Sequence, residues 1–240
     1  MILLRPIELT PRLLALARQV PKGAQFADIG TDHARLPVWL IEQGVVDAAI
    51  AADLREGPLE RARHTAAHHA VTERISFRLG DGLKPLKPGE ADVIAIAGMG
   101  GETIAEILSA APWTKEEGVT LLLQPMTSTD ALRRWLSEHG YRIAGEQLVR
   151  EENTLYVVLT VDGGPMPPLS PGEIWVGRQW QGMDTPLRGE YLSILSERAE
   201  KALDGARRST KPEDAPRREA MEALCEELLK MKKEWDSWQL

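Results

Sequence analysis

Apolar residues follow two alternating patterns along the first two thirds of the chain. Short continuous apolar runs, almost without polar alternation, are typical of parallel strands buried on both faces of a sheet. The predicted strands of this kind lie at 24–30, 47–54, 74–81, 91–101 and 119–125. Segments with apolar residues at helical spacing come before, between and after these runs. The predicted helices lie at 9–20, 34–43, 58–70, 102–110 and 128–140.

Two further apolar runs, at 141–153 and 154–161, alternate more with polar residues and are joined by a turn. They predict an antiparallel hairpin at one edge of the sheet. A series of strand–helix units closed by such a hairpin is characteristic of Rossmann-like methyltransferases, whereas a dehydrogenase usually continues with a second βαβ half. We therefore expect an α/β fold built on a class I methyltransferase sheet.

The last third of the chain changes character. Residues 162–186 are rich in Pro and Gly and predict an irregular crossing segment. Two apolar stripes at three- and four-residue spacing follow, and they predict an α-helical hairpin (coiled-coil) domain whose stripes form a packing core. The stripes are Leu192, Leu195, Ala199, Ala202 and Ala206, and then Met221, Leu224, Leu228, Met231, Trp235 and Trp238. The expected domains are a methyltransferase domain at 1–161 and a linker with the helical hairpin at 162–240.

Composition narrows the class of protein. The single cysteine, Cys225, excludes an internal disulfide framework and a cysteine-based zinc cluster. No stretch approaches the roughly 18 consecutive apolar residues of a membrane span, and Arg and Pro interrupt the N-terminal residues where a signal peptide would be apolar. We expect a cytoplasmic protein. The formal net charge of −7 gives no overall positive field toward nucleic acid.

Carboxylates stand at the ends of three predicted strands, where ligands bind in sheets of this type. Asp28 ends the first strand, and Asp32 follows in the same loop. Both would repel the pyrophosphate of a dinucleotide, because like charges about 4 Å apart cost several kcal/mol at intermediate dielectric. S-adenosylmethionine instead carries a positive ammonium and a positive sulfonium, which suit an acidic loop. The sequence therefore favours this ligand.

The acids at the next two strand ends fit the rest of that ligand. Asp53 is placed to bridge both ribose hydroxyls, and Asp81 can accept a hydrogen bond from an adenine amino group. Each acid alone is equally well explained as a helix cap or a solvated loop residue, but three at successive strand ends favour a site. His33 is more readily explained as a cap or a packed polar residue than as a catalytic group. No spacing of His, Asp or Cys predicts a metal site.

Six motifs in this order resemble the bacterial tRNA (adenine-22 N1)-methyltransferase family, the TrmK-like enzymes. They are "DIGTDHARLP", "AADLREGPLERAR", "GDGL", "IAGMGG", "LLLQP" and "LRRWLSEHGY". The resemblance covers residues 1 to about 161, and beyond them the helical hairpin agrees in type only. It implies methylation of N1 of one adenine in tRNA, with S-adenosylmethionine as the cofactor. By position, the cofactor pocket would be lined by Asp28, Gly30, Asp32, His33, Asp53, Leu54, Asp81, Gly82, Ala97 and Gly98.

The fourth strand ends in "AGMGG", which has no side-chain acceptor and no aromatic ring for a target base. Many amino-methylating enzymes carry both there, but N1 of adenine already exposes a lone pair and needs no deprotonation. Backbone groups of this loop can shape the slot, and Met99 and Gly100 are the expected substrate contacts. Asp32 is the expected catalytic residue, since a carboxylate stabilises a cationic product as it forms. The target base must be flipped out of its stack.

Basic residues gather at the expected hairpin tip, although neither domain is basic as a whole. Arg207, Arg208, Arg217 and Arg218 are therefore the expected tRNA contacts of the hairpin, with Lys211 close to them in the sequence. Two alternatives remain open from the sequence. One is a methyltransferase of a small molecule or a protein, with the hairpin as a dimerisation arm. The other is a non-catalytic S-adenosylmethionine-binding protein.

Overall fold

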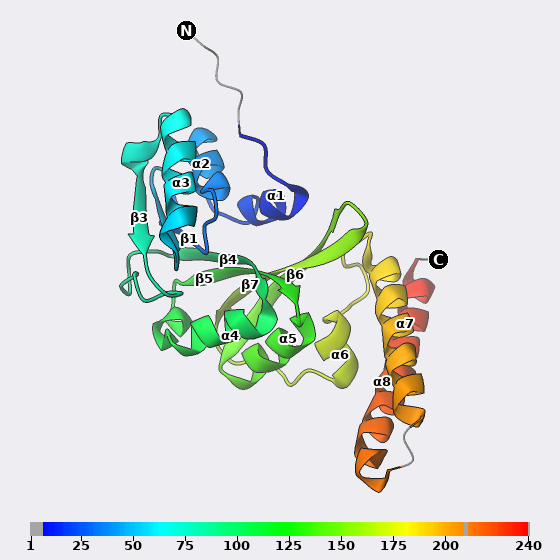
Figure 1. Cartoon of the computed structure of the whole chain (residues 1–240). Coiled ribbons are helices and arrows are strands. Elements are labelled where there is room, and N and C mark those ends of the chain that lie inside the picture. Colours follow the sequence, from blue (N-terminus) through cyan, green and yellow to red (C-terminus); the bar gives the residue numbers. More distant parts are fainter. Residues whose placement is uncertain (1–6, 209–210, 240) are drawn as a thin grey trace. The chain divides into compact units, whose positions relative to one another are not determined.

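One seven-stranded sheet, in the order β3-β2-β1-β4-β5-β7-β6, organises the part of the chain that ends at Met166 (Figure 1). The strands are β1 (Phe26–Ile29), β2 (Ala49–Asp53), β3 (Ile75–Leu79), β4 (Val93–Gly100), β5 (Thr120–Thr127), β6 (Tyr141–Glu151) and β7 (Thr154–Gly163). The first five are parallel, and β7 pairs antiparallel with both β5 and β6. The predicted strands and edge hairpin are confirmed.

The structure, a computed structural model, describes residues 7–208 and 211–239. Both outer limits of the predicted domains, residues 1 and 240, lie outside this part. So do residues 209 and 210, which lie between the two predicted stripes of the helical hairpin. The chain divides into two compact units, one ending at Met166 and the other beginning at Pro167.

Helices cover both faces of the sheet (Figure 1). On one face lie α1 (Pro11–Ala17), α2 (Arg35–Glu42) and α3 (Glu56–His68), and on the other α4 (Gly101–Ser109) and α5 (Thr129–Glu138). Short 3-10 helices occupy Thr72–Arg74 and Pro112–Lys115. All five α-helices match the predicted ones within a few residues at each end. The burial of every residue of β1 and β2 explains why these strands read as continuous apolar runs.

The sheet carries its ligand-binding crevice where the strand order reverses. β1 lies between β2 and β4, so the connections after β1 and after β4 leave toward opposite faces. At such a point the loops at the carboxyl ends of the strands diverge and leave an open crevice. The loop that begins at Gly30 and the bulge of β4 at Gly98 meet there.

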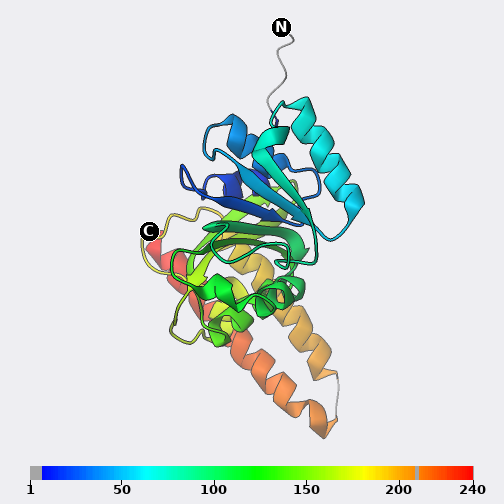
Figure 2. The same cartoon turned by 90° about the vertical axis from the view of Figure 1, so that its left-hand side faces the viewer.

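The second unit contains α6 (Pro171–Val176), α7 (Arg188–Arg207) and α8 (Ala215–Trp238), with a short 3-10 helix at Pro212–Asp214. Both views show α7 and α8 side by side and running in opposite directions, which confirms the predicted helical hairpin (Figures 1 and 2). Among the described residues, no helix has the length and apolar character needed to cross a membrane.

Two predictions for this unit were wrong. The segment 162–186 is not wholly irregular, because it contains α6, which begins with a capping box between Ser170 and Glu173. The stripe of α7 was also misplaced toward its end, since Leu203 is buried and Ala202 is exposed. Small alanines satisfy a spacing pattern without being needed in the core, whereas a leucine one position away gains more by burial.

Candidate active site

Two neighbouring cavities open at the carboxyl ends of the parallel strands. The first, the β2-side cavity, has a volume of about 410 Å³ and lies among the ends of β1, β2 and β3 and one side of α4. The second, the β5-side cavity, has a volume of about 500 Å³ and lies among the loop after β1, the ends of β4 and β5, and the start of α1. Gly30 lines both cavities, so they meet at the loop after β1.

The predicted site residues divide between the two cavities. The β2-side cavity is lined by Gly30, Asp53, Leu54, Asp81, Gly82 and Met99. The β5-side cavity is lined by Asp28, Gly30, Asp32, His33, Ala97 and Gly98. Gly100 lines neither cavity. The four predicted arginines belong to the second unit.

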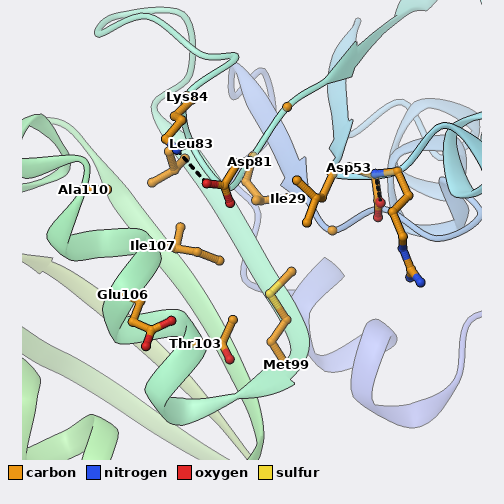
Figure 3. A pocket seen from close by; sticks show the side chains of 15 residues that line it. Ile29, Asp53, Asp81, Leu83, Lys84, Met99, Thr103, Glu106, Ile107 and Ala110 are labelled. Atoms are coloured by element: carbon orange, nitrogen blue, oxygen red, sulfur yellow. Dashed lines mark hydrogen bonds and ion pairs between the residues drawn. The ribbon is translucent and has the colours of Figure 1, made fainter.

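Asp53 is the buried acid of the β2-side cavity, with only 7% of its surface exposed. Its Oδ1 accepts a hydrogen bond of 2.8 Å from the backbone N–H of Arg55, which fixes the carboxylate beside the turn into α3. Figure 3 shows Asp53 and Ile29 facing Met99, Thr103 and Ile107 across the cavity. The result is a slot with apolar walls and one oriented acid.

Asp81 sits at the far end of the same cavity but is a different kind of acid. Its side chain is 58% exposed, and its carboxylate lies 2.6 Å from the ammonium group of Lys84 (Figure 3). An exposed ion pair of this kind contributes little to stability. Asp81 is therefore free to exchange Lys84 for another donor at small cost.

The backbone conformation and the surroundings of residue 30 require a glycine. Its φ is +78°, and a Cβ at this position would lie 2.2 Å from the Cε of Met99. Any side chain would therefore be strained and would also collide with the methionine. The absence of a side chain lets Met99 lie against the loop where the two cavities meet.

The β5-side cavity contains a buried acid of its own. Burial raises the pKa of Asp28 to about 6; the Thr31 hydroxyl beside it acts to lower this pKa, and the neighbouring charge of Asp53 adds to the increase. Thr31 is itself only 2% exposed. No side chain caps the N-terminus of α2, which begins after Ala34 at the same cavity. The free N–H groups of this helix end are what a polar ligand would complete.

Asp32, the expected catalytic residue, is not a free carboxylate. Its side chain is 63% exposed and forms an ion pair with Arg61 of α3. His33 Nε2 lies 3.6 Å from its other oxygen. The hydrogen bond from Arg61 is the main reason why the pKa of Asp32 is lowered. Asp32 thus stays ionised, but part of its charge is already balanced.

The three glycines at the end of β4 and the start of α4 have different structural roles. Gly98 lies at a bulge between β4 and β5, has a φ of +76°, and would have open space around a Cβ. In contrast, a Cβ on Gly101 would lie 2.2 Å from the backbone oxygen of Ser128, and one on Gly100 would lie 3.3 Å from Oγ1 of Thr127. Gly98 therefore opens the cavity, while Gly100 and Gly101 allow the loop to pack against the end of β5.

The far wall of the β5-side cavity was not predicted from the sequence. This wall consists of Thr10, Arg12 and Leu13 near the start of α1 and of Gln124 and Met126 on β5. Arg12 forms an ion pair of 2.9 Å with Glu151 of β6, and its guanidinium lies 4.5 Å from the ring centre of Tyr156 on β7. Residues so far apart in the sequence meet only because α1 packs beside the edge hairpin.

The basic hairpin tip is partly compensated by acids of its own unit. Arg207 forms an ion pair of 2.9 Å with Glu222 of α8. Arg208 and Arg217 are exposed. In residues 7–208 and 211–239, no group of three or more His, Cys, Asp or Glu side chains is arranged to hold a metal ion.

Known proteins resemble this chain both in sequence and in structure. Residues 9–159 match a family described as a methyltransferase domain. A Bacillus subtilis tRNA (adenine(22)-N(1))-methyltransferase is 38% identical over 158 residues, which cover 66% of this chain and 66% of that protein. The sequence alignment thus spans slightly less than two thirds of this curated relative.

Solved structures extend the similarity to nearly the whole chain. The crystal structure of the B. subtilis m1A22 tRNA methyltransferase TrmK has a TM-score of 0.84 at 28% identity and covers 94% of this chain and 99% of that one. A Streptococcus pneumoniae protein crystallised with S-adenosyl-L-methionine has a TM-score of 0.76 at 32% identity and covers 91% of this chain and 100% of that one. The chain belongs to the TrmK-like family of tRNA (adenine(22)-N(1))-methyltransferases.

Proposed function

We propose that this protein transfers a methyl group from S-adenosylmethionine to N1 of an adenine in tRNA, at a position of the adenine-22 type. The observation that carries the proposal is the pair of cavities that meet at Gly30, each with its own buried acid. The β2-side cavity suits the nucleoside of the methyl donor, and the β5-side cavity suits its methionine end and leaves room for a base beside it. The B. subtilis relative, named as an enzyme of this activity, supports the choice of substrate.

The residues present fit S-adenosylmethionine. In the β2-side cavity, Asp53 would accept from the ribose hydroxyls and Asp81 from the adenine amino group, with Leu54 and Gly82 beside the nucleoside. At the junction, Asp28 would face the ammonium group of the methionine part. The uncapped N-terminus of α2 would bind its carboxylate. We assign Gly30, His33, Ala97 and Gly98 to the same methionine end.

S-adenosylmethionine, when bound, supplies a methyl group on a positively charged sulfur. The N1 of adenine is a nucleophile with a free lone pair, so no side chain needs to remove a proton. The protein contributes to the reaction by orienting the base, excluding water and stabilising the positive charge that the base gains. We propose Asp32 for the last task, with Arg61 holding its carboxylate at the rim. Met99 is the substrate contact where the two cavities meet.

The helical hairpin is proposed to capture the tRNA. Arg207, Arg208, Arg217 and Arg218 supply positive charge at one end of this hairpin, whereas the chain as a whole carries a net charge of −7. Phosphate contacts by such a cluster give affinity that depends strongly on salt. The methyltransferase domain at 1–161 would then hold the chemistry, and residues 162–240 would hold the tRNA. A tRNA substrate also places the reaction in the cytoplasm.

One experiment tests this function directly. The protein is incubated with S-adenosylmethionine and an unmodified tRNA transcript that has adenine at position 22, and the modified nucleosides are then mapped. We expect 1-methyladenine at that position, and none in a transcript with guanine there. Methyl transfer only to proteins or small molecules would contradict the proposal. Cofactor binding without any turnover would contradict it as well.

A further inference from the structure

Gln124, in the second half of β5, has an amide whose orientation is fixed by its neighbours. The residue is only 1% exposed and lines the β5-side cavity. Its Oε1 accepts from the Arg12 guanidinium over 3.3 Å, and its Nε2 donates to the carbonyl of Pro125 over 2.8 Å. A guanidinium can only donate and a carbonyl can only accept, so the oxygen and the nitrogen of the amide cannot exchange places.

Arg12 is itself fixed from three sides. Its guanidinium donates to Glu151 over 2.9 Å and lies over the ring of Tyr156. The backbone N–H of Arg12 also donates to the Glu151 carboxylate over 3.2 Å. Because α1, β5, β6 and β7 all contribute to this cluster, the amide is held more rigidly than a lone side chain at a cavity wall. Such rigidity reduces the cost of binding.

The amide keeps two hydrogen-bonding positions for a ligand. A glutamine side chain has two N–H donors and two acceptor positions on its oxygen. Arg12 takes one acceptor position and Pro125 takes one donor. The second N–H faces only the sulfur of Met126, a weak acceptor, at 3.8 Å. One donor and one acceptor therefore remain on neighbouring atoms of a buried, oriented amide.

This remaining pair matches one edge of adenine. The N6 amino group donates and N7 accepts on neighbouring positions, and glutamine forms two hydrogen bonds with these two atoms in protein–DNA complexes. Guanine carries the acceptor O6 in place of the amino group, so its edge would place two oxygens against each other. A contact at N6 and N7 also leaves N1, on the Watson–Crick edge, free for methylation.

We propose that Gln124 is a specificity-determining residue that binds the flipped target adenine through N6 and N7, and that Arg12 is the positioning residue for its amide. This inference rests on the proposed function. It concerns only how the base is recognised, so it can fail while the activity itself stands.

The test changes the base as well as the protein. Two synthetic tRNAs are compared, one with adenine and one with 7-deazaadenine at the target, in which a C–H group replaces N7. The variant is Gln124→Met, which keeps the length of the side chain and removes both hydrogen bonds. Gln147→Met makes the same change on β6, outside the linings of both cavities. Cofactor affinity and thermal unfolding are measured for each protein.

We expect the wild type and Gln147→Met to methylate the 7-deaza tRNA with kcat/KM lower by about tenfold, as for one lost base contact. Gln124→Met should be slower on normal tRNA by a similar or larger factor and should treat both tRNAs alike. Its cofactor affinity should equal that of the wild type. Loss of the rate difference between the two tRNAs, together with retained cofactor binding, is the signature of a direct contact between Gln124 and the base.

Three results would overturn the inference. They are equal wild-type rates on the two tRNAs, unchanged discrimination in Gln124→Met, and wild-type activity of that variant on normal tRNA. If Gln124→Met does not fold, Arg12→Lys replaces it, since lysine retains the charge beside Glu151 but releases the amide, and discrimination should again fall. Absence of methylation of normal tRNA by the wild type would instead reject the proposed function.

Discussion

Asp28 and Asp53 lie near the carboxyl ends of the adjacent parallel strands β1 and β2, and the charge of Asp53 adds to burial in raising the pKa of Asp28 to about 6. Ionised Asp28 is costly in the free protein, because it is buried and lies near the charge of Asp53. A cationic ligand between them removes that cost. The pair therefore links cofactor binding to pH.

The affinity for S-adenosylmethionine should increase as the pH rises from 5 to 7.5. Its ammonium group requires the ionised form of Asp28, and this carboxyl is largely protonated below a pH of about 6 in the free protein. Asp28→Asn should bind more weakly at pH 7.5 and show little pH dependence. Titration calorimetry across this range measures both effects. His33→Ala is the control, because it removes the histidine of the same loop and should leave the pH dependence in place; a flat wild-type profile would contradict the prediction.

The stability of the free protein should change in the opposite sense. Burial raises the pKa of Asp28 from 3.8 to about 6, so the folded state binds the proton more tightly than the unfolded state. The stability that this tighter proton binding at Asp28 contributes is complete below pH 4 and is lost as the pH rises through about 6. At pH 7.5, Asp28→Asn should therefore have a free energy of unfolding about 1–3 kcal/mol larger than that of the wild type, measured by denaturant titration. At pH 4 the two proteins should differ little. A pH-independent difference between the two would argue against a raised pKa.

Asp53→Ala should weaken cofactor binding far more than it weakens the fold. Two lost hydrogen bonds between a carboxylate and the ribose would cost roughly 2–4 kcal/mol, and the buried position of Asp53 protects these bonds from water. Asp81→Ala is the matched comparison, and its effect should be smaller, since that acid is exposed and already paired with Lys84. Calorimetry that finds equal losses for the two variants, or none for Asp53→Ala, would remove the ribose assignment.

Asp32→Asn should retain the fold and sharply reduce turnover at saturating cofactor. The pair with Arg61 makes a second variant informative. If the carboxylate itself stabilises the cationic product, Arg61→Gln should leave more activity than Asp32→Asn, because the acid remains. Single-turnover rates separate the two roles. Equal rates in both variants would mean that the ion pair matters only as a structural contact.

Replacing Arg207, Arg208, Arg217 and Arg218 with Gln should weaken tRNA binding and lower its salt dependence by up to about three counterions.

Removing the chain after Met166 should weaken tRNA binding at least as much. It should leave cofactor affinity nearly unchanged, since both cavities are lined by the first unit. The control replaces Lys230, Lys232 and Lys233, nearer the end of α8, with Gln. Identical affinities and salt slopes for all of these proteins would assign the hairpin a structural role or a role in dimerisation.

Local patterns predicted most of this fold. β1 and β2 are almost entirely apolar because every residue in them is buried, and the helices alternate with the strands at their own period. Asp28, Asp53 and Asp81 could be grouped from the sequence because the carboxyl ends of parallel strands always meet at one edge of a sheet. The helix α6 was missed within a Pro-rich segment, although Ser170 and Glu173 carry the capping signal.

The chemical state of the site was decided by tertiary structure alone. Asp32 is paired because α3 brings Arg61 to the loop, and Gly100 packs against Thr127 rather than lining a cavity. Arg12 and Gln124 are 112 positions apart and interact only once α1 has packed beside the end of β5. Secondary structure follows from residues that are neighbours in the chain. The partners and charge balance of a site depend on contacts between distant segments, and these exist only in the folded protein.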